Sequence, residues 1–143
     1  MLAMGGSRGG PGFSLVELLV VLSIIAILAS MSVQSYINYT NKAKVASYAL
    51  PIARACMADV ASACSAGSPI PANPVGNSSF PNCQATRTVA VGTVNLSTEE
   101  NFNCSNDGSL SSGVIKARIV GVGSYSAVCR VSVKPFQCKI EAN

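Results

Sequence analysis

The sequence predicts an α+β fold, in which one long N-terminal α-helix packs on a small antiparallel β-sheet. The first observation is a predominantly apolar run over residues 13–33 that carries one charge, Glu17. The second is a segment over residues 34–64 that has no glycine and spaces its apolar side chains like a helix. The third is a set of Val- and Thr-rich segments after residue 85 in which apolar residues alternate with polar ones.

The apolar run is long enough to cross a bilayer. Residues 13–33 contain no proline or glycine, and as a helix they would extend roughly 31 Å, about one hydrocarbon core. Residues 1–12 are glycine-rich, carry a single basic residue, Arg8, and read as a short leader, with Met4 as an alternative start. A small-residue cleavage point precedes the run, so we expect the run to remain in the mature protein as a transmembrane or filament-core helix.

The helix is expected to continue beyond the membrane as an amphipathic segment over residues 34–66. Its apolar positions are three or four residues apart and form one face: Val45, Tyr48, Ile52, Cys56, Val60 and Ala63. Pro51 should kink this helix rather than end it, and Gly67 should end it. A loop rich in Pro, Asn and Ser is predicted over residues 67–85.

The rest of the chain, residues 86–143, is predicted to form an antiparallel sheet with loops. Strands are expected at residues 86–97, 113–122, 125–133 and 136–141, with a polar surface loop at residues 98–112. Short breaks at Gly123-Ser124 and Lys134-Pro135 favour hairpin connections. A sheet of this size has one apolar face to cover, and the amphipathic helix can cover it. We therefore expect residues 34–143 to form one globular head.

Composition argues against several classes of function. The chain of 143 residues has a formal charge of +4, too mild to indicate nucleic acid by itself. It contains no histidine, no C-x-x-C pair and no glycine-rich phosphate loop before a helix, so the sequence predicts neither an enzyme nor a bound metal or cofactor.

The six cysteines all follow the apolar run and indicate disulfides in an oxidising compartment. Cys56 and Cys64 would lie about 12 Å apart along one helix, beyond the roughly 7 Å that a bridge allows. Each should therefore reach outside the helix. Cys129 and Cys138 flank a turn symmetrically, as a bridge between adjacent strands requires. The expected pairs are Cys64–Cys83, Cys56–Cys104 and Cys129–Cys138.

The segment Gly12-Phe13-Ser14-Leu15-Val16-Glu17, followed by the apolar run, resembles the class III signal and N-terminal helix of type IV pilins and their relatives. The resemblance extends from residue 12 to about residue 45 and includes Tyr36 and Tyr39; the remaining chain agrees only in plan. It implies a pilin-like fold, cleavage between Gly12 and Phe13 by a prepilin peptidase, and methylation of the new Phe13 amine. In related pilins a C-terminal disulfide bounds a variable surface loop, which would suit Cys129–Cys138.

The resemblance also implies a role for Glu17. A carboxylate inside an apolar helix is costly unless it is paired. In a filament its partner would be the Phe13 ammonium of a neighbouring subunit; the alternative is that Glu17 lies at the membrane interface and reaches water. Many major pilins carry proline and glycine where this chain has Gln34 and Ala26, so the helix unwinding associated with those residues is not implied here.

Five basic residues of the terminal strands could form a stripe: Lys116, Arg118, Arg130, Lys134 and Lys139. Solvated positions on an outer sheet face are the favoured interpretation, because such a face needs charges. The alternative is a DNA-binding patch, as in competence-type minor pilins.

We therefore predict a structural subunit of a type IV pilus or related filament. Its expected partners are other pilins, the prepilin peptidase, the inner-membrane assembly machinery and the membrane itself; DNA is possible but not favoured. The protein would cross the inner membrane once before assembly and then enter an extracellular pilus. The alternatives are a DNA-binding minor pilin, a type II secretion pseudopilin and a single-pass membrane protein with an uncut N-terminus.

Overall fold

The computed structural model of the chain describes residues 12–132 and 136–143, so the expected Lys134-Pro135 turn lies outside the described residues. The chain divides into two compact units, Met1–Ile37 and Asn38–Asn143. Helical structure runs through α1 (Leu15–Lys44), a π-helical turn η1 (Val45–Ala49) and α2 (Leu50–Ser65). The predicted long helix is confirmed, and it ends where expected, since Gly67 follows it with a φ of 69°.

The π-helical turn lies just before Pro51, where the sequence predicts a kink. The Leu50 N–H bonds to the Val45 carbonyl, five residues back, instead of the usual four. Pro51 then occupies an early position of α2, where its missing N–H costs little. The π-helical turn therefore allows the helical structure to continue past Pro51.

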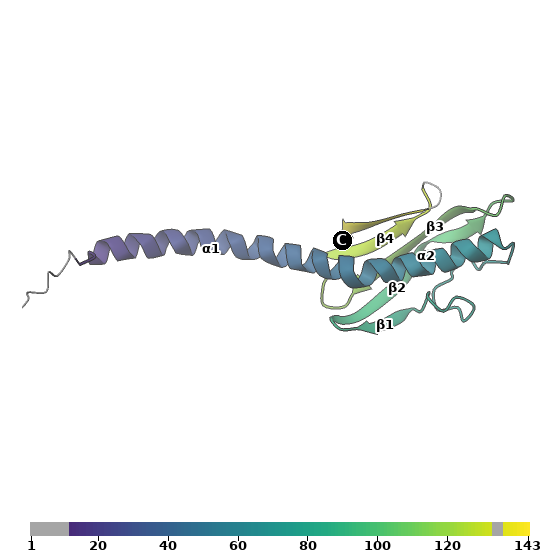
Figure 1. The fold of residues 1–143 in the computed structure, drawn as a ribbon, viewed down its shortest axis with the longest axis horizontal. Coiled ribbons are helices and arrows are strands. Elements are labelled where there is room, and N and C mark those ends of the chain that lie inside the picture. Colours follow the sequence, from purple (N-terminus) through teal and green to yellow (C-terminus); the bar gives the residue numbers. More distant parts are fainter. Residues whose placement is uncertain (1–11, 133–135) are drawn as a thin grey trace, which may run out of the picture. The chain divides into compact units, whose positions relative to one another are not determined.

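The second unit contains a five-stranded antiparallel sheet with strand order β1-β2-β3-β4-β5 (Figure 1). The strands are β1 (Thr86–Val89), β2 (Gly92–Cys104), β3 (Leu110–Ile119), β4 (Tyr125–Arg130) and β5 (Gln137–Ala142). Each strand pairs with the next along the chain, so the predicted α+β, pilin-like architecture with its meander is confirmed.

Two details of the strand prediction are wrong. The segment 86–97 is not one strand, because it turns back on itself between β1 and β2 before Gly92, whose φ is 134°. The segment 98–112 is not a loop, because it holds the second half of β2 and the start of β3. Its polar side chains bond across the strands, as when Asn103 Nδ2 donates to Ser112 Oγ at 3.1 Å. The sheet therefore has one strand more than the largest number expected.

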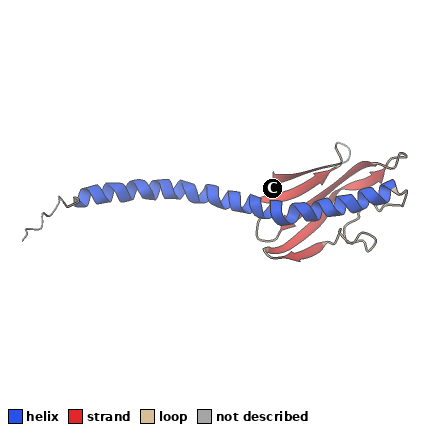
Figure 2. Ribbon diagram, in the orientation of Figure 1, coloured by secondary structure: helices blue, strands red, loops and turns tan. Residues whose placement is uncertain are grey.

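One face of the sheet packs against η1 and α2 to form the core (Figure 2). The buried helical residues are Val45, Ala49, Ala53, Cys56, Met57, Val60 and Cys64. They meet alternate residues of the central strands, such as Ile115, Ala117 and Ala127. Tyr48, Ile52 and Ala63, placed on the buried face by their spacing, are partly buried at the margin of this core.

Three disulfides join the described elements of the second unit: Cys56–Cys83, Cys64–Cys104 and Cys129–Cys138. The last is the pair expected from the sequence; the two residues are direct partners across β4 and β5, with Cα atoms 4.0 Å apart. The expected pairs Cys64–Cys83 and Cys56–Cys104 are wrong.

The path of the loop before β1 explains why Cys83 bonds to Cys56 and not to Cys64. Asp59 accepts hydrogen bonds from the backbone N–H and the side-chain amide of Asn82, at 3.2 and 3.1 Å. These bonds hold Cys83 beside the middle of α2 rather than its end. The end of α2 instead meets the hairpin after β2, where a Cβ on Gly108 would contact Ser65 Cα at 3.4 Å.

Candidate assembly site

The N-terminal segment places the predicted cleavage junction outside the helix. Gly12, Phe13 and Ser14 precede α1, and all three are exposed. Ser14 and Glu17 form half of a capping box, since the Glu17 carboxylate oxygen Oε2 accepts a hydrogen bond from the Ser14 N–H at 3.4 Å. The interpretation from the sequence considered only the charge of Glu17 and so missed this helix-capping role. The spacing Ser-x-x-Glu before an apolar run is the sequence signal that indicates it.

Glu17 therefore lies within reach of the chain end that cleavage would create. Ser14 follows Phe13 directly, so the carboxylate lies beside the residue whose amine would become the N-terminus. A negative charge in the first turn is also favoured by the helix dipole. Among the described residues no basic side chain forms an ion pair with Glu17.

The helix that follows presents an apolar surface on every side. No residue of α1 is buried, and side chains such as Leu15 and Met31 are 81% and 70% exposed. This helical run is long and apolar enough to cross a membrane, judged by length and composition. An apolar surface of this extent is unstable in water, so it needs lipid or other apolar helices around it.

Four of the predicted basic residues lie on the sheet face away from α2, while Lys134 lies outside the described residues. Lys116 and Lys139 are both in register with Val128, and the strand alternation places Arg118 and Arg130 on the same face. Lys116 Nζ lies 3.2 Å from Glu99 Oε1, and Arg130 Nη2 lies 2.8 Å from Glu141 Oε2. These pairs give the face a mixed charge rather than a continuous basic stripe.

We expect the full chain not to retard duplex DNA in a gel at about 0.15 M salt, because nucleic-acid binding depends on unneutralised cations. The measurement compares the unmodified protein with a Lys116→Ala/Arg118→Ala/Arg130→Ala variant. A salt-sensitive shift that the triple variant loses would contradict this expectation and restore the DNA-binding interpretation.

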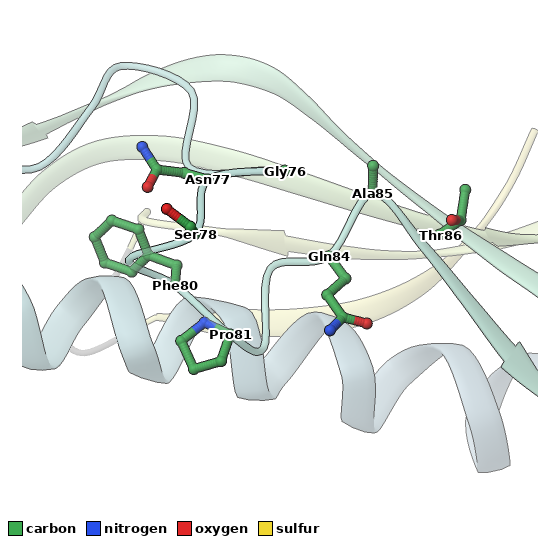
Figure 3. Close-up of a pocket in the computed structure, with 8 residues that line it drawn as sticks. All are labelled: Gly76, Asn77, Ser78, Phe80, Pro81, Gln84, Ala85 and Thr86. Atoms are coloured by element: carbon green, nitrogen blue, oxygen red, sulfur yellow. The ribbon is translucent and has the colours of Figure 1, made fainter.

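An open cavity of about 440 Å³ lies in the loop between α2 and β1. Figure 3 shows Asn77 and Ser78 on one stretch of this loop and Gln84 leading into β1. The residues that line it are Gly76, Asn77, Ser78, Phe80, Pro81, Gln84, Ala85 and Thr86, none of which is charged. Within residues 12–132 and 136–143, no group of His, Cys, Asp or Glu side chains could hold a metal ion. The polar side chains that line the cavity are hydroxyls and amides, so none of them is a carboxylate, imidazole or amine that could act as a general base.

The described geometry defines a class of protein: a globular head on an N-terminal helix that can be anchored in a membrane. A family model described as the prokaryotic N-terminal methylation motif matches residues 11–33. This match, which includes Gly12, Phe13 and Glu17, supports a type IV pilin-like protein, and this kind of family is structural rather than enzymatic. No curated protein and no solved structure matches the chain.

Proposed function

We propose that the protein is a structural subunit of a type IV pilus or a related filament, assembled after its leader is removed. The observation that carries the proposal is the position of the methylation motif on the exposed apolar helix. The motif supplies a processing signal, and the helix supplies a surface that must be buried in lipid or among other helices. The domain division we propose is a leader at 1–12, a membrane and filament helix at 13–33, and a head at 34–143.

Processing would hydrolyse the Gly12–Phe13 peptide bond. Water adds to the Gly12 carbonyl carbon, the C–N bond breaks, and Phe13 leaves with a free amine that is protonated at neutral pH. Phe13 is 85% exposed and lies outside α1. Both facts support access of a peptidase to the Gly12–Phe13 bond. The space around Gly12 is open as well, since a Cβ built there meets no atom of the described chain within 4 Å.

Assembly would then transfer the apolar helix from lipid to a bundle of like helices. Burial of side chains such as Leu18, Leu22 and Ile25 against neighbours stabilises the bundle without exposing them to water. The Phe13 ammonium of one subunit and the Glu17 carboxylate of the next would neutralise each other in this dry core, which fixes the register between subunits.

The proposed partners follow from this sequence of events. They are a prepilin peptidase, the inner-membrane assembly machinery and further pilins, with a location first in the inner membrane and then in an extracellular filament. Electron microscopy of isolated surface filaments, combined with peptide identification, separates a major subunit from a minor pilin or a secretion pseudopilin.

The N-terminus of the mature protein provides the direct test of processing. We expect mass spectrometry of protein from a host with a prepilin peptidase to find a peptide that begins at N-methylated Phe13. The same protein made without the peptidase is the control and should retain its leader. A mature protein that still carries residues 1–12 in the presence of the peptidase would exclude the pilin assignment.

A further inference from the structure

The end of the head at which α1 enters carries exposed apolar side chains. Among the described residues of Asn38–Asn143, the large hydrophobic side chains that remain exposed are Tyr39, at 73%, and Val120, at 58%. Tyr39 lies on α1, and Val120 begins the turn between β3 and β4. The other large apolar side chains of the head that the structure describes are buried or half-buried.

Backbone contacts and a shared groove bring these two residues to the same end of the head. The Val120 N–H donates to the Thr93 carbonyl at 2.8 Å, which joins the β3–β4 turn to the start of β2, directly after the β1–β2 turn. Val91 of the β1–β2 turn in turn lines a groove of about 360 Å³ together with Tyr39. Figure 1 shows both turns at the end of the sheet where η1 begins. We call this set of Tyr39, Val91 and Val120 the entry face.

Two cations flank the entry face. Lys42 and Lys44 lie in the last turn of α1, and both are exposed. Within the part of the chain that the structure describes, neither forms an ion pair with an acidic side chain. The lysine side chains are long enough to reach past the turns toward an anionic surface.

Chain connectivity keeps the entry face close to the bilayer whenever the apolar helix is inserted. Tyr39 follows Val33, the end of the apolar run, by six residues, or about 9 Å of helix. The headgroup region adds about 5–7 Å on each side of the hydrocarbon core. Tyrosine, exposed apolar tips and lysine are the side chains that favour this interfacial zone.

We propose that the entry face docks on the lipid headgroup region before assembly, with Val120 and Val91 in contact with lipid and the two lysines beside anionic phosphates. This proposal rests on the membrane-anchored stage of the proposed function. It gives the head one preferred orientation on the membrane, so that subunits would be presented uniformly for extraction into a filament.

The absence of tryptophan from the chain allows a direct measurement. Full-length protein with the single change Val120→Trp is reconstituted in vesicles of phosphatidylcholine and phosphatidylglycerol that carry brominated acyl chains. We expect strong quenching of the introduced indole and a blue-shifted emission. The matched control is Asn106→Trp, an exposed position in the hairpin at the opposite end of the sheet, which should be quenched severalfold less. Adding Lys42→Ala and Lys44→Ala to Val120→Trp should reduce the quenching in anionic vesicles but not in purely neutral ones.

A third variant, Leu22→Trp, reports whether the apolar helix itself inserts. If Leu22→Trp is quenched and Val120→Trp is no more quenched than Asn106→Trp, the docking proposal is wrong while membrane anchoring stands. If Leu22→Trp is not quenched, the membrane stage itself is wrong. A Val120→Trp emission that depends on the protein-to-lipid ratio, and not on bromination, would show that a second copy of the chain covers the entry face, which also overturns the proposal.

Discussion

Replacing Glu17 with alanine is expected to abolish filament assembly while leaving the protein inserted in the membrane. The substitution removes a charge from the apolar helix, so insertion becomes no harder. In the filament core, however, the Phe13 ammonium would be left buried without its partner. Breaking a buried ion pair in this way costs about 3–5 kcal/mol. Each 1.4 kcal/mol changes an equilibrium constant about tenfold, and the cost recurs at every subunit contact. The amount of filament recovered by shearing should therefore fall at least about a hundredfold.

Glutamine at the same position separates the two roles of Glu17. The Glu17→Gln side chain can still accept the Ser14 N–H and so preserve the helix cap, but it carries no charge. Filament yield is measured by quantitative blotting of the sheared fraction, and membrane retention by extraction of the same cells. If Glu17→Gln assembles normally and Glu17→Ala does not, capping rather than ion pairing is the essential contribution. Normal assembly by both variants would remove Glu17 from the mechanism.

The helical half of the molecule was largely predictable because its signals are local. The apolar run, the spacing from Val45 to Val60 and the stop at Gly67 each act within a few turns of helix. The π-helical turn at Val45–Ala49 was not predictable from Pro51 alone, because a proline can be accommodated by a kink or by a wider turn. The resemblance predicts a processing site between Gly12 and Phe13. The Ser14–Glu17 hydrogen bond, by contrast, is indicated in the sequence only by the Ser-x-x-Glu capping pattern, which an interpretation based on charge does not consider.

The strands were harder to predict because their stability comes from partners distant in sequence. The segment 98–112 is polar, so alternation gives it no strand signal, but cross-strand side-chain bonds and the buried ring of Phe102 hold it in the sheet. The same limit applies to the cysteines. Cys129 and Cys138 flank a short connection, so their pairing follows from register. The partners of Cys56 and Cys64 depend on where the loop that carries Cys83 crosses α2, which the chain sets through the Asp59–Asn82 bonds.

Gly113 is the position at which we expect the smallest change to have the largest effect on stability. It lies in β3 beneath the ring of Phe102, and a Cβ there would come within 2.4 Å of two carbons of that ring. Its φ of 141° is also one that L-residues rarely adopt. Phe102 is only 2% exposed and its N–H bonds to the Ala72 carbonyl, so the ring has little freedom to withdraw. Overpacking and backbone strain together should make Gly113→Ala cost about 2–5 kcal/mol.

The cost is measured as a shift in thermal or urea unfolding of the full chain in detergent with its disulfides intact; the melting temperature should fall by roughly 10 °C. Gly121→Ala is the matched control, because Gly121 also has a positive φ, 87°, but a Cβ there meets no atom within 4 Å. It should cost about 1 kcal/mol from backbone strain alone. The double variant Gly113→Ala/Phe102→Leu replaces the ring with a smaller side chain and so relieves the clash. Its loss of unfolding free energy should therefore be less than the sum of the losses in the two single variants. Equal destabilisation by Gly113→Ala and Gly121→Ala would mean that the glycine is required for its backbone conformation and not for the approach of Phe102.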